Sequence, residues 1–536
     1  MSSWARFSGL AAAAMVLAAG AASGQSSKDK SDDSGKFVRS GAIPRLVIEL
    51  DDAACDALRQ TARKYATGVL RENGRTTYEE VSFKLKGAAG SFREFDDLPS
   101  FTVKMDRGNK DQRFHGLQKF QLNKSPQDGT YLHELLGSDI FSEAGILAPR
   151  VTHARVWIND RDMGLYVVKE GFDRTLIKRG FEASDGNLYD GGFCQDVDAE
   201  LEKDEGSGPD DRSDLIELLA ICTEPDLVQR WTRIAEVVDV EAFLTFMALE
   251  QMLGHWDGYC FNRNNYRLYF DPESKKAYFL PHGMDQLLGD PEASILDSPP
   301  AIVAGAIMKN PAWRAAYRKR VGELLPLFDA DKLKKRVDQV AKRLQPALED
   351  FNKDEANAHK VAVSDLKNRL EARERSLKDQ KGQPDPKPLV FRTDQPEKLL
   401  KWRVNSECED ASLTEEKDNG IMLLKIATGK SGRCVASWRR GVLLPRGKYR
   451  FHAVIRAKDV VALPGDENAP GVGAGLRLSV GTRENSLVGS NDYKAVDFEF
   501  EVTEEAADVE LVIELRASKG FIAIKAESLS LTKLKN

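Results

Sequence analysis

Two aspartates, Asp257 and Asp285, are placed where a turn of the chain would bring their carboxylates together. Asp257 follows an apolar segment with helical character, so it should lie on a loop that emerges from a buried element. Residues 266–270 and 277–280 resemble two strands joined by a turn, which predicts a β-hairpin between the two aspartates. Because the two ends of a hairpin lie side by side, we expect Asp285 to lie near the Asp257 loop.

The asparagines of the same loop extend this pattern. Asn262 lies five residues after Asp257, and Asn265 directly precedes the first hairpin strand. Phosphoryl transfer uses one carboxylate to orient the acceptor hydroxyl, and a second carboxylate with an amide oxygen to hold Mg²⁺. Protein kinases arrange these groups as Asp, Asn five residues on, a hairpin and a second Asp. The pattern favours Asp257 as the catalytic residue and Asp285 as a metal ligand, and the five-residue spacing favours Asn262 as the further ligand.

Two histidines leave a rival interpretation open. His255 and His282 flank the same loop and hairpin, and histidine with aspartate is a common ligand set for a hydrolytic metal centre. Neither histidine has a partner at the helical i, i+4 spacing. Asp and Asn are also frequent turn residues, so the loop alone does not decide between these interpretations.

The surrounding sequence predicts the elements that would position this loop. Strand-like runs occupy residues 43–50, 81–86, 101–105, 120–122 and 152–158, and a second hairpin is expected where residues 159–162 turn into 164–168. Residues 130–144 have helical spacing, and Asp239 can cap a helix over 240–253 that Gly254 ends. Residues 301–380 form a second helical block.

Composition restricts the class of protein. The 536 residues carry a formal charge of −6, so there is no global cationic field to capture nucleic acid. Residues 1–24 have one arginine, an Ala-rich apolar run and small residues, as in a secretory signal peptide. We therefore expect a secreted, periplasmic or cell-envelope protein with no membrane span in the mature chain. Residues 25–42 predict a disordered polar linker.

An acidic segment, residues 196–214, separates the predicted strands from the helices. A calcium loop is one interpretation, but the glycine that an EF-hand needs at its sixth position is replaced by Leu201. A solvated insertion is the preferred interpretation.

The end of the chain has a different character. A charged helix and a Pro-rich linker are expected over residues 346–388, and apolar residues alternate with polar ones beyond them. Residues 389–536 therefore predict a β-sandwich accessory domain, similar to jelly-roll-like carbohydrate-binding modules. Trp438 and Tyr493 are the candidate sugar-contacting aromatics.

Several stretches in the same order make the chain similar to the CotH family, the atypical kinases named for spore coat protein H. The resemblance covers about residues 45–340 and is carried by these segments: Lys86–Ser91, Phe101–Lys104, Phe114–Leu117, Gly145–Arg150, Val156–Glu170 and Asp257–Asp285.

The resemblance implies an α+β protein: a divergent protein-kinase-like domain over 43–345, followed by the all-β domain. It implies transfer of the ATP γ-phosphate to a protein Ser or Thr hydroxyl with Mg²⁺ or Mn²⁺. Asp257 would be catalytic, Asp285 with Asn262 or Asn265 would bind the metal, Lys104 would contact the phosphates and Glu170 would line the nucleotide site. The alternative is a non-catalytic envelope or surface protein that binds a glycan or a protein partner through its β-sandwich.

Overall fold

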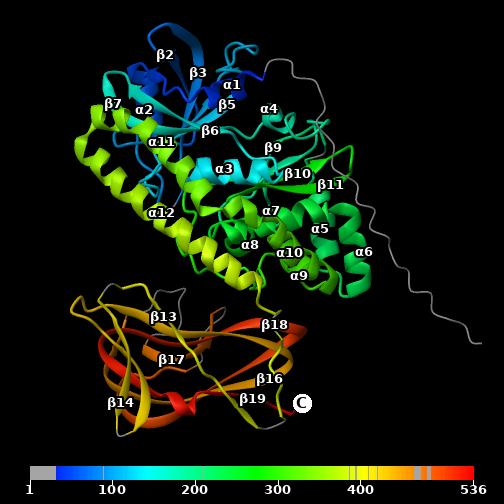
Figure 1. The fold of residues 1–536 in the computed structure, drawn as a ribbon, viewed down its shortest axis with the longest axis vertical. Helices are drawn as coiled ribbons and strands as arrows, with labels where there is room; N and C mark the ends of the chain where they lie inside the picture. Colours follow the sequence, from blue (N-terminus) through cyan, green and yellow to red (C-terminus); the bar gives the residue numbers. More distant parts are fainter. Residues whose placement is uncertain are drawn as a thin grey trace, which may run out of the picture. The chain divides into compact units, whose positions relative to one another are not determined.

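The computed structural model describes residues 32–535, except for residues 89, 209, 385–386, 393–394, 409, 419, 464–472 and 480–484. The predicted signal peptide, residues 1–24, lies outside the described residues. Helices and strands are mixed along the chain (Figure 1), as an α+β protein requires. The chain divides into two compact units: Met1–Gln127 with Pro149–Arg179 and Lys342–Ala356, and Asp128–Ala148 with Gly180–Ala341 and Asn357–Asn536.

A closed barrel with the strand order β1-β2-β3-β4-β5-β7-β6 forms the first unit. Its strands are β1 (Arg45–Glu49), β2 (Ala66–Glu72), β3 (Thr76–Lys86), β4 (Ser100–Lys104), β5 (Lys119–Asn123), β6 (Val151–Ile158) and β7 (Arg161–Glu170). Closure comes from the parallel pairing of β1 with β6, and alternate residues such as Phe83, Phe101 and Phe120 fill the core. The β6–β7 hairpin lies where the sequence predicts it, and α2 (Asp52–Gln60) and α4 (Arg174–Ile177) complete the unit.

The prediction of a disordered linker over 25–42 is wrong for its second half, because residues 33–40 form helix α1 (Asp33–Ser40). Asp32 caps the helix and also forms an ion pair with Arg150. Phe37 is 7% exposed and joins the barrel core. The buried ring of Phe37 and the partly buried ion pair between Asp32 and Arg150 therefore order a segment whose composition is otherwise polar.

The second unit places helices around a four-stranded sheet with the order β11-β10-β8-β9. The strands are β8 (Leu188–Asp190), β9 (Glu202–Glu205), β10 (Tyr266–Asp271) and β11 (Lys276–Pro281). The helices are α3 (His133–Glu143), α5 (Ser213–Cys222), α6 (Leu227–Val237), α7 (Val240–Met252), α8 (Tyr259–Asn262), α9 (Ile302–Met308) and α10 (Pro311–Leu324). The β10–β11 hairpin expected between Asp257 and Asp285 is present, with Tyr266 opposite Pro281.

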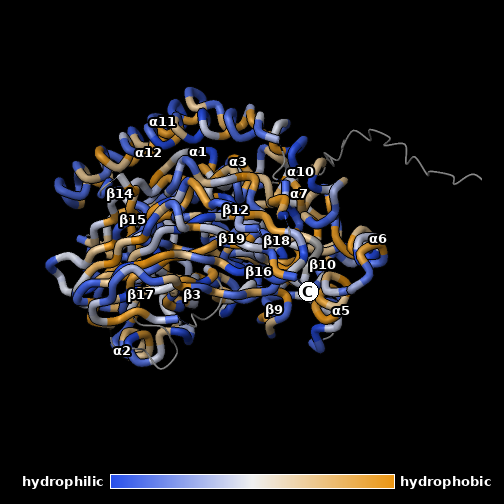
Figure 2. The backbone as a smooth tube through the Cα atoms, turned by 90° about the horizontal axis from the view of Figure 1, so that it is seen from below, coloured by the Kyte–Doolittle hydropathy of each residue, from blue (hydrophilic) through white to orange (hydrophobic). Residues whose placement is uncertain are grey.

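Two long helices follow, α11 (Ala330–Phe351) and α12 (Lys353–Lys381). Figure 2 shows hydrophilic and hydrophobic residues alternating along α12, although its sequence is strongly charged. Leu366, Leu370 and Leu377 are buried, and so is the guanidinium of Arg373, which is 1% exposed. The charged helix expected at the start of residues 346–388 is present, and its apolar side packs into the second unit.

Arg373 ties α12 to two neighbouring segments. Its nitrogens donate to the carbonyl oxygens of Gln251 (2.7 Å) and Met252 (2.9 Å) at the end of α7. They also donate to the carbonyl oxygens of Pro291 (2.9 Å) and Ala293 (2.6 Å). Burial lowers the pKa of Arg373 to about 10, so it is still protonated at neutral pH and donates to buried carbonyl oxygens at the end of α7 and in the segment after β11.

The acidic segment is partly buried, so the prediction of a solvated insertion is wrong for several of its residues. Asp196 is 5% exposed, and Lys203, Asp204 and Glu205 belong to or end strand β9. Asp204 forms an ion pair with Arg267 of β10 at 3.3 Å. The carboxylates of this segment are used as hydrogen-bond acceptors inside the unit.

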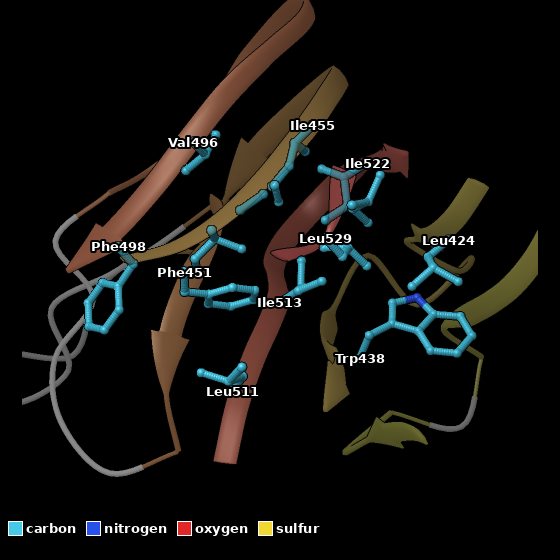
Figure 3. Close-up of a cluster of buried hydrophobic side chains, with 14 of the residues drawn as sticks. Leu424, Trp438, Phe451, Ile455, Val496, Phe498, Leu511, Ile513, Ile522 and Leu529 are labelled. Atoms are coloured by element: carbon cyan, nitrogen blue, oxygen red, sulfur yellow. The ribbon is translucent and has the colours of Figure 1, made fainter. Parts of the chain in front are cut away.

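The remaining strands, after α12, form one connected eight-stranded sheet with its own hydrophobic core. The strands are β12 (Pro396–Lys398), β13 (Arg403–Ser406), β14 (Ser412–Asp418), β15 (Ile421–Ala427), β16 (Cys434–Ala462), β17 (Gly473–Leu478), β18 (Gly489–Lys525) and β19 (Ser530–Lys533). Figure 3 shows part of the core, including Phe451, Ile513 and Trp438. Trp438 is 4% exposed and donates to the carbonyl of Lys425, so its proposed role as a sugar platform is wrong.

We expect Arg373→Met to lower the free energy of unfolding by about 2–4 kcal/mol, because the substitution keeps the aliphatic volume but leaves buried carbonyl oxygens without a donor. Denaturant titration followed by tryptophan fluorescence measures the loss. Arg375→Met, an exposed position on the same helix, is the control and should change the free energy by less than about 0.5 kcal/mol. Equal stability of the two variants would contradict the role of Arg373.

Candidate active site

The loop that carries Asp257 begins at the end of a buried helix. Asp239 caps α7 by accepting a hydrogen bond from the backbone N–H of Ala242 at 3.0 Å, as predicted. Ten consecutive residues of α7, from Phe243 to Met252, are buried. Gly254 has φ +60°, a conformation that suits glycine, and it turns the chain away from the helix axis. The helix is thus a fixed base for the residues that follow.

Glu250 connects this base to the loop, and the sequence reasoning missed it. Its side chain is completely buried, and its two carboxylate oxygens accept hydrogen bonds from the backbone N–H groups of Tyr259 (3.0 Å) and Cys260 (2.9 Å). These two residues open α8, whose first N–H groups have no partner within the helix. Burial raises the pKa of the Glu250 carboxyl, while the nearby His255 opposes that rise. Two backbone donors therefore fix the chain within three residues of Asp257.

The carboxylate of Asp257 is surrounded by amide groups. Asn262 donates its side-chain N–H to Oδ1 of Asp257. Asn264 donates to both carboxylate oxygens at 3.2 Å, and Asn265 donates to Oδ2 at 2.8 Å and to the backbone carbonyl of Asp257 at 3.0 Å. Donors directed at a carboxylate stabilise its ionised form and hold it in one orientation. Asn264, which the sequence reasoning did not single out, completes this set.

The hairpin brings the Asp285 segment to Asn265. The backbone N–H of His282 donates to the carbonyl of Asn265 at 3.0 Å, which extends the β10–β11 pairing one residue beyond Tyr266 and Pro281. Gly283 has φ +53°, and a Cβ at this position would lie 2.0 Å from Oδ1 of Asn265. The amide oxygen of Asn265 therefore faces the turn that leads to Asp285. The sequence-based expectation that the hairpin joins these two segments is confirmed.

A histidine from α3 holds the backbone of Asp285. Nδ1 of His133 lies 2.9 Å from the carbonyl oxygen of Asp285, and because a carbonyl can only accept, the ring nitrogen donates. His133 is 5% exposed, and Asp128 accepts a hydrogen bond from its backbone N–H at 2.9 Å. The Asp285 side chain is half-buried, as is that of Asp257. The carboxylate of Asp257 lies among amide groups.

Asp196 of the acidic segment supports α8 from the other side. The Tyr259 hydroxyl donates to Oδ1 of Asp196 at 3.1 Å, and the backbone N–H of Ile302 at the start of α9 donates to Oδ2 at 2.8 Å. The N–H of Val303 donates to the Tyr259 hydroxyl at 3.1 Å. Burial raises the pKa of both the Asp196 carboxyl and the Tyr259 hydroxyl. The loop is therefore held by a connected polar network.

Lys104 and Glu170, the predicted nucleotide-binding residues, belong to the first unit and point to opposite faces of the barrel wall. Val103, Phe120 and Glu170 are directly opposite one another on β4, β5 and β7, so they share the inner face. Lys104 is on the outer face, with its Nζ 5.3 Å from the ring centre of Tyr65. Glu170 is 2% exposed and accepts hydrogen bonds from Arg179 at 2.7 and 3.2 Å. The structure does not bring these two side chains together.

The rival metal centre finds no support in the described part of the chain. His255 is 1% exposed, and its Nε2 lies 3.1 Å from the carbonyl oxygen of His282. Among the described residues, no group of three or more His, Cys, Asp or Glu side chains has the geometry to hold a metal ion. His255 instead links the loop to the segment that follows the hairpin.

The arrangement presents an oriented, half-buried carboxylate on a rigid loop and a second carboxylate on a neighbouring turn. The first can orient a hydroxyl group and accept its proton. The second, with an amide oxygen, supplies the hard oxygen donors that Mg²⁺ prefers. These are the residue types that phosphoryl transfer requires.

Comparison with known proteins identifies the class. The family described as CotH kinase protein matches residues 83–377, more than half of the chain. The chain therefore belongs to the CotH kinase protein family, and the predicted resemblance is confirmed.

Similar curated proteins come from a fungus and a bacterium. Invasin CotH2 of Rhizopus delemar is 25% identical over 349 residues, 57% of this chain and 57% of that protein. Inner spore coat protein H of Bacillus subtilis is 23% identical over 256 residues, 44% of this chain and 69% of that protein. The chain thus spans little more than half of the length of the fungal relative. Among the described residues, no helix is long and apolar enough to cross a membrane.

Two solved structures align with a quarter of the chain, each with a TM-score of 0.19. One is TmCBM61 in complex with beta-1,4-galactotriose, 14% identical and covered over 90% of its length. The other is the enzymatically active domain of bacteriophage CBA120 tailspike protein 4, 13% identical and covered over 19%. At this TM-score neither alignment supports a conclusion about the fold.

We expect Glu250→Gln to loosen the Asp257 loop, because the amide replaces one of two acceptors with a donor that faces a backbone N–H. Hydrogen exchange, measured by mass spectrometry on peptides that cover residues 255–262, should become about tenfold faster or more. Glu241→Gln, an exposed position on the same helix α7, is the control and should leave the exchange of this loop unchanged. Unchanged exchange in Glu250→Gln would show that the loop does not depend on this carboxylate.

Proposed function

We propose that this chain is an atypical protein kinase that transfers the γ-phosphate of ATP to a Ser or Thr hydroxyl of a protein, with Mg²⁺ or Mn²⁺. The second unit would then be the catalytic part of a divergent kinase-like fold. Membership of the CotH kinase protein family supports the reaction class. The relatives' names, invasin and spore coat protein, do not describe a reaction, so the proposal depends on the site.

The observation that carries the proposal is the amide-held carboxylate of Asp257 beside the hairpin that leads to Asp285. Asp257 would accept a hydrogen bond from the acceptor hydroxyl and take its proton as the oxygen attacks phosphorus. The three surrounding amides hold the carboxylate in one orientation. Its position five residues before Asn262 has the spacing of the catalytic loop of protein kinases.

Asp285 and an asparagine would hold the metal. Magnesium, when bound, neutralises charge on the transferring phosphate. The donor set fits, because a carboxylate and amide oxygens are hard ligands. Asn262 and Asn265 both donate N–H groups to Asp257, which directs each amide oxygen away from that carboxylate. The oxygen of Asn265 faces Gly283, two residues before Asp285, which favours Asn265 over Asn262 as the ligand.

The first unit would contribute to ATP binding, as the family resemblance implies. Lys104, on the outer face of β4, remains the proposed phosphate contact. Glu170, on the opposite face of the barrel wall, would support the nucleotide site indirectly, through its ion pair with Arg179. The predicted signal peptide over residues 1–24 supports action outside the cytoplasm, and the relatives named as invasins and spore coat proteins agree with a surface location.

One observation favours the alternative, binding of a glycan through the C-terminal strands. The ring of Tyr493 lies 5.1 Å from the guanidinium carbon of Arg456 and 4.8 Å from Nζ of Lys525. A partly exposed aromatic ring flanked by cations suits an acidic sugar, which offers an apolar ring face and a carboxylate. This role does not require the Asp257 site and is compatible with catalysis.

We expect Asp257→Asn to reduce phosphate transfer by at least about 100-fold, because the amide cannot accept the hydroxyl proton. Asp285→Asn should abolish transfer by weakening metal binding. Transfer from γ-labelled ATP to a serine-rich acceptor protein, with Mg²⁺ or Mn²⁺, measures both. Glu273→Gln, exposed at the turn of the same hairpin, is the control and should retain activity. Transfer that survives in Asp257→Asn would refute the proposed role, and a wild-type protein without transfer would favour the non-catalytic alternative.

The two asparagines should differ in metal dependence. We expect Asn265→Ala to raise the Mg²⁺ concentration for half-maximal transfer by about tenfold, and Asn262→Ala to raise it less. Both variants lose a hydrogen bond to the Asp257 carboxylate, so the difference between them reports metal binding and not the loss of that bond. A larger shift in Asn262→Ala would assign the metal to the residue with the kinase spacing.

A further inference from the structure

A second concave site lies at the other end of strand β10 from Asp257. A cavity of about 360 Å³ is lined by residues of the acidic segment, of α5 and of the β10–β11 turn. Strand β10 begins directly after Asn265 and ends at Asp271, which lines the cavity. At about 3.3 Å per residue, the strand separates the two sites by roughly 20 Å. The cavity, which we name the acidic pocket, is therefore not part of the proposed kinase site.

Charge in the acidic pocket is strongly one-sided. Its lining includes four carboxylates, Asp185, Asp214, Glu217 and Asp271, against the single ammonium of Lys275. Asp185 and Glu217 are exposed at the rim, and Glu217 lies 3.8 Å from Arg233, a distant and weak pairing. Apolar lining is also present, from Leu218, Val237, Phe270 and Pro272. A cleft with low-dielectric walls and charges of one sign raises the local concentration of ligands of the opposite charge.

Asn187 adds an independent indication of a ligand. It lines the acidic pocket and is 8% exposed. Its side-chain NH₂ donates to Asp214 at 2.8 Å and to the Tyr189 hydroxyl at 3.2 Å. Since only the NH₂ group can donate to a carboxylate, Asp214 fixes the orientation of the amide. The amide oxygen is then left buried and accepts no hydrogen bond from any described residue.

Two glycines, on either side of Ser207, face that oxygen. A Cβ at Gly206 would lie 2.6 Å from Oδ1 of Asn187, and one at Gly208 would lie 2.8 Å from it. Gly208 also lines the acidic pocket. Buried amide oxygens without a donor are uncommon, because each costs about 1–3 kcal/mol. Only glycine fits at these two positions, so the backbone of residues 206–208 packs beside this unpaired oxygen at the wall of the acidic pocket.

We propose that the acidic pocket binds a cationic nitrogen group, a guanidinium or a primary ammonium, on an aliphatic stem. The four carboxylates of the lining and the unpaired amide oxygen of Asn187 are hydrogen-bond acceptors, and Lys275 is the single charged donor among the described lining residues. A ligand with several N–H donors would therefore complement this pocket. The apolar lining would contact the methylene groups of the stem. The apolar lining beside the carboxylates suits an organic cation better than a bare metal ion. The same chemistry is offered by an arginine or lysine side chain of a peptide and by a free polyamine.

Binding of matched peptides to the full-length protein tests this proposal. We expect a short fluorescein-labelled peptide with one arginine to bind at least about tenfold more tightly than the same peptide with citrulline, which has the same shape but no charge. Anisotropy measures the peptides, and calorimetry measures spermidine as the polyamine. Tighter binding of the peptide or of spermidine identifies the source of the cation. Equal binding of the arginine and citrulline peptides, or no binding of either cation, would overturn the proposal.

Variants place the binding in the acidic pocket. Asp185→Asn with Glu217→Gln changes two exposed carboxylates and should weaken cation binding by about tenfold or more. Gly208→Val should do the same by displacing the Asn187 side chain, because a Cβ at this position would lie 2.8 Å from its amide oxygen. Asp379→Asn with Glu415→Gln, two exposed positions outside the acidic pocket, should leave binding unchanged. Binding that the first two variants leave intact would place the cation elsewhere and refute the proposal. Because no nucleotide is needed, Asp257→Asn must also leave cation binding unchanged, which keeps this test independent of the proposed kinase activity.

Discussion

The completely buried carboxylate of Glu250 is the interaction on which the candidate site depends. Burying an ionisable group is costly unless its oxygens are hydrogen-bonded, and here both oxygens accept backbone N–H groups at the start of α8. The same bonds satisfy donors that a short helix cannot satisfy internally. The cost of burial is therefore offset only when the loop adopts one conformation, and that conformation sets where Asp257 lies.

The parts of the site that follow from local sequence could be predicted. Asp239 as a helix cap, the loop after α7 and the β10–β11 hairpin all depend on residues close together in the chain, and the structure has each of them. Hairpin geometry alone then implies that the segment after Pro281 returns to Asn265. The return of the His282 segment to Asn265 could be predicted for this reason, because the intervening chain is one short antiparallel unit.

The supporting residues could not be predicted, since their roles come from contacts that are distant in sequence. Glu250 looks like any polar residue in an apolar helix, and Asp196 belongs to a segment whose composition indicates a solvated loop. Only tertiary packing reveals that Asp196 binds Tyr259 and the start of α9, 63 and 106 residues away. Helix α1 and the buried face of α12 could not be predicted for the same reason. Burial of Phe37 in α1 and of Arg373 in α12 depends on distant segments, and the polar composition of these helices does not indicate it.

The acidic segment shows how one stretch of sequence serves two ends of a sheet. Asp196 lies at its beginning and supports the Asp257 loop, whereas Ser207, Gly208 and Asp214 lie near its end and line the acidic pocket. Between them, β9 pairs with β8, and Asp204 contacts Arg267 of β10. Arg267 also pairs with Asp190 of β8 at 2.6 Å, so one arginine links strands β8, β9 and β10. The same acidic segment thus supplies carboxylates both to the support of the Asp257 loop and to the acidic pocket, two sites that strand β10 keeps apart.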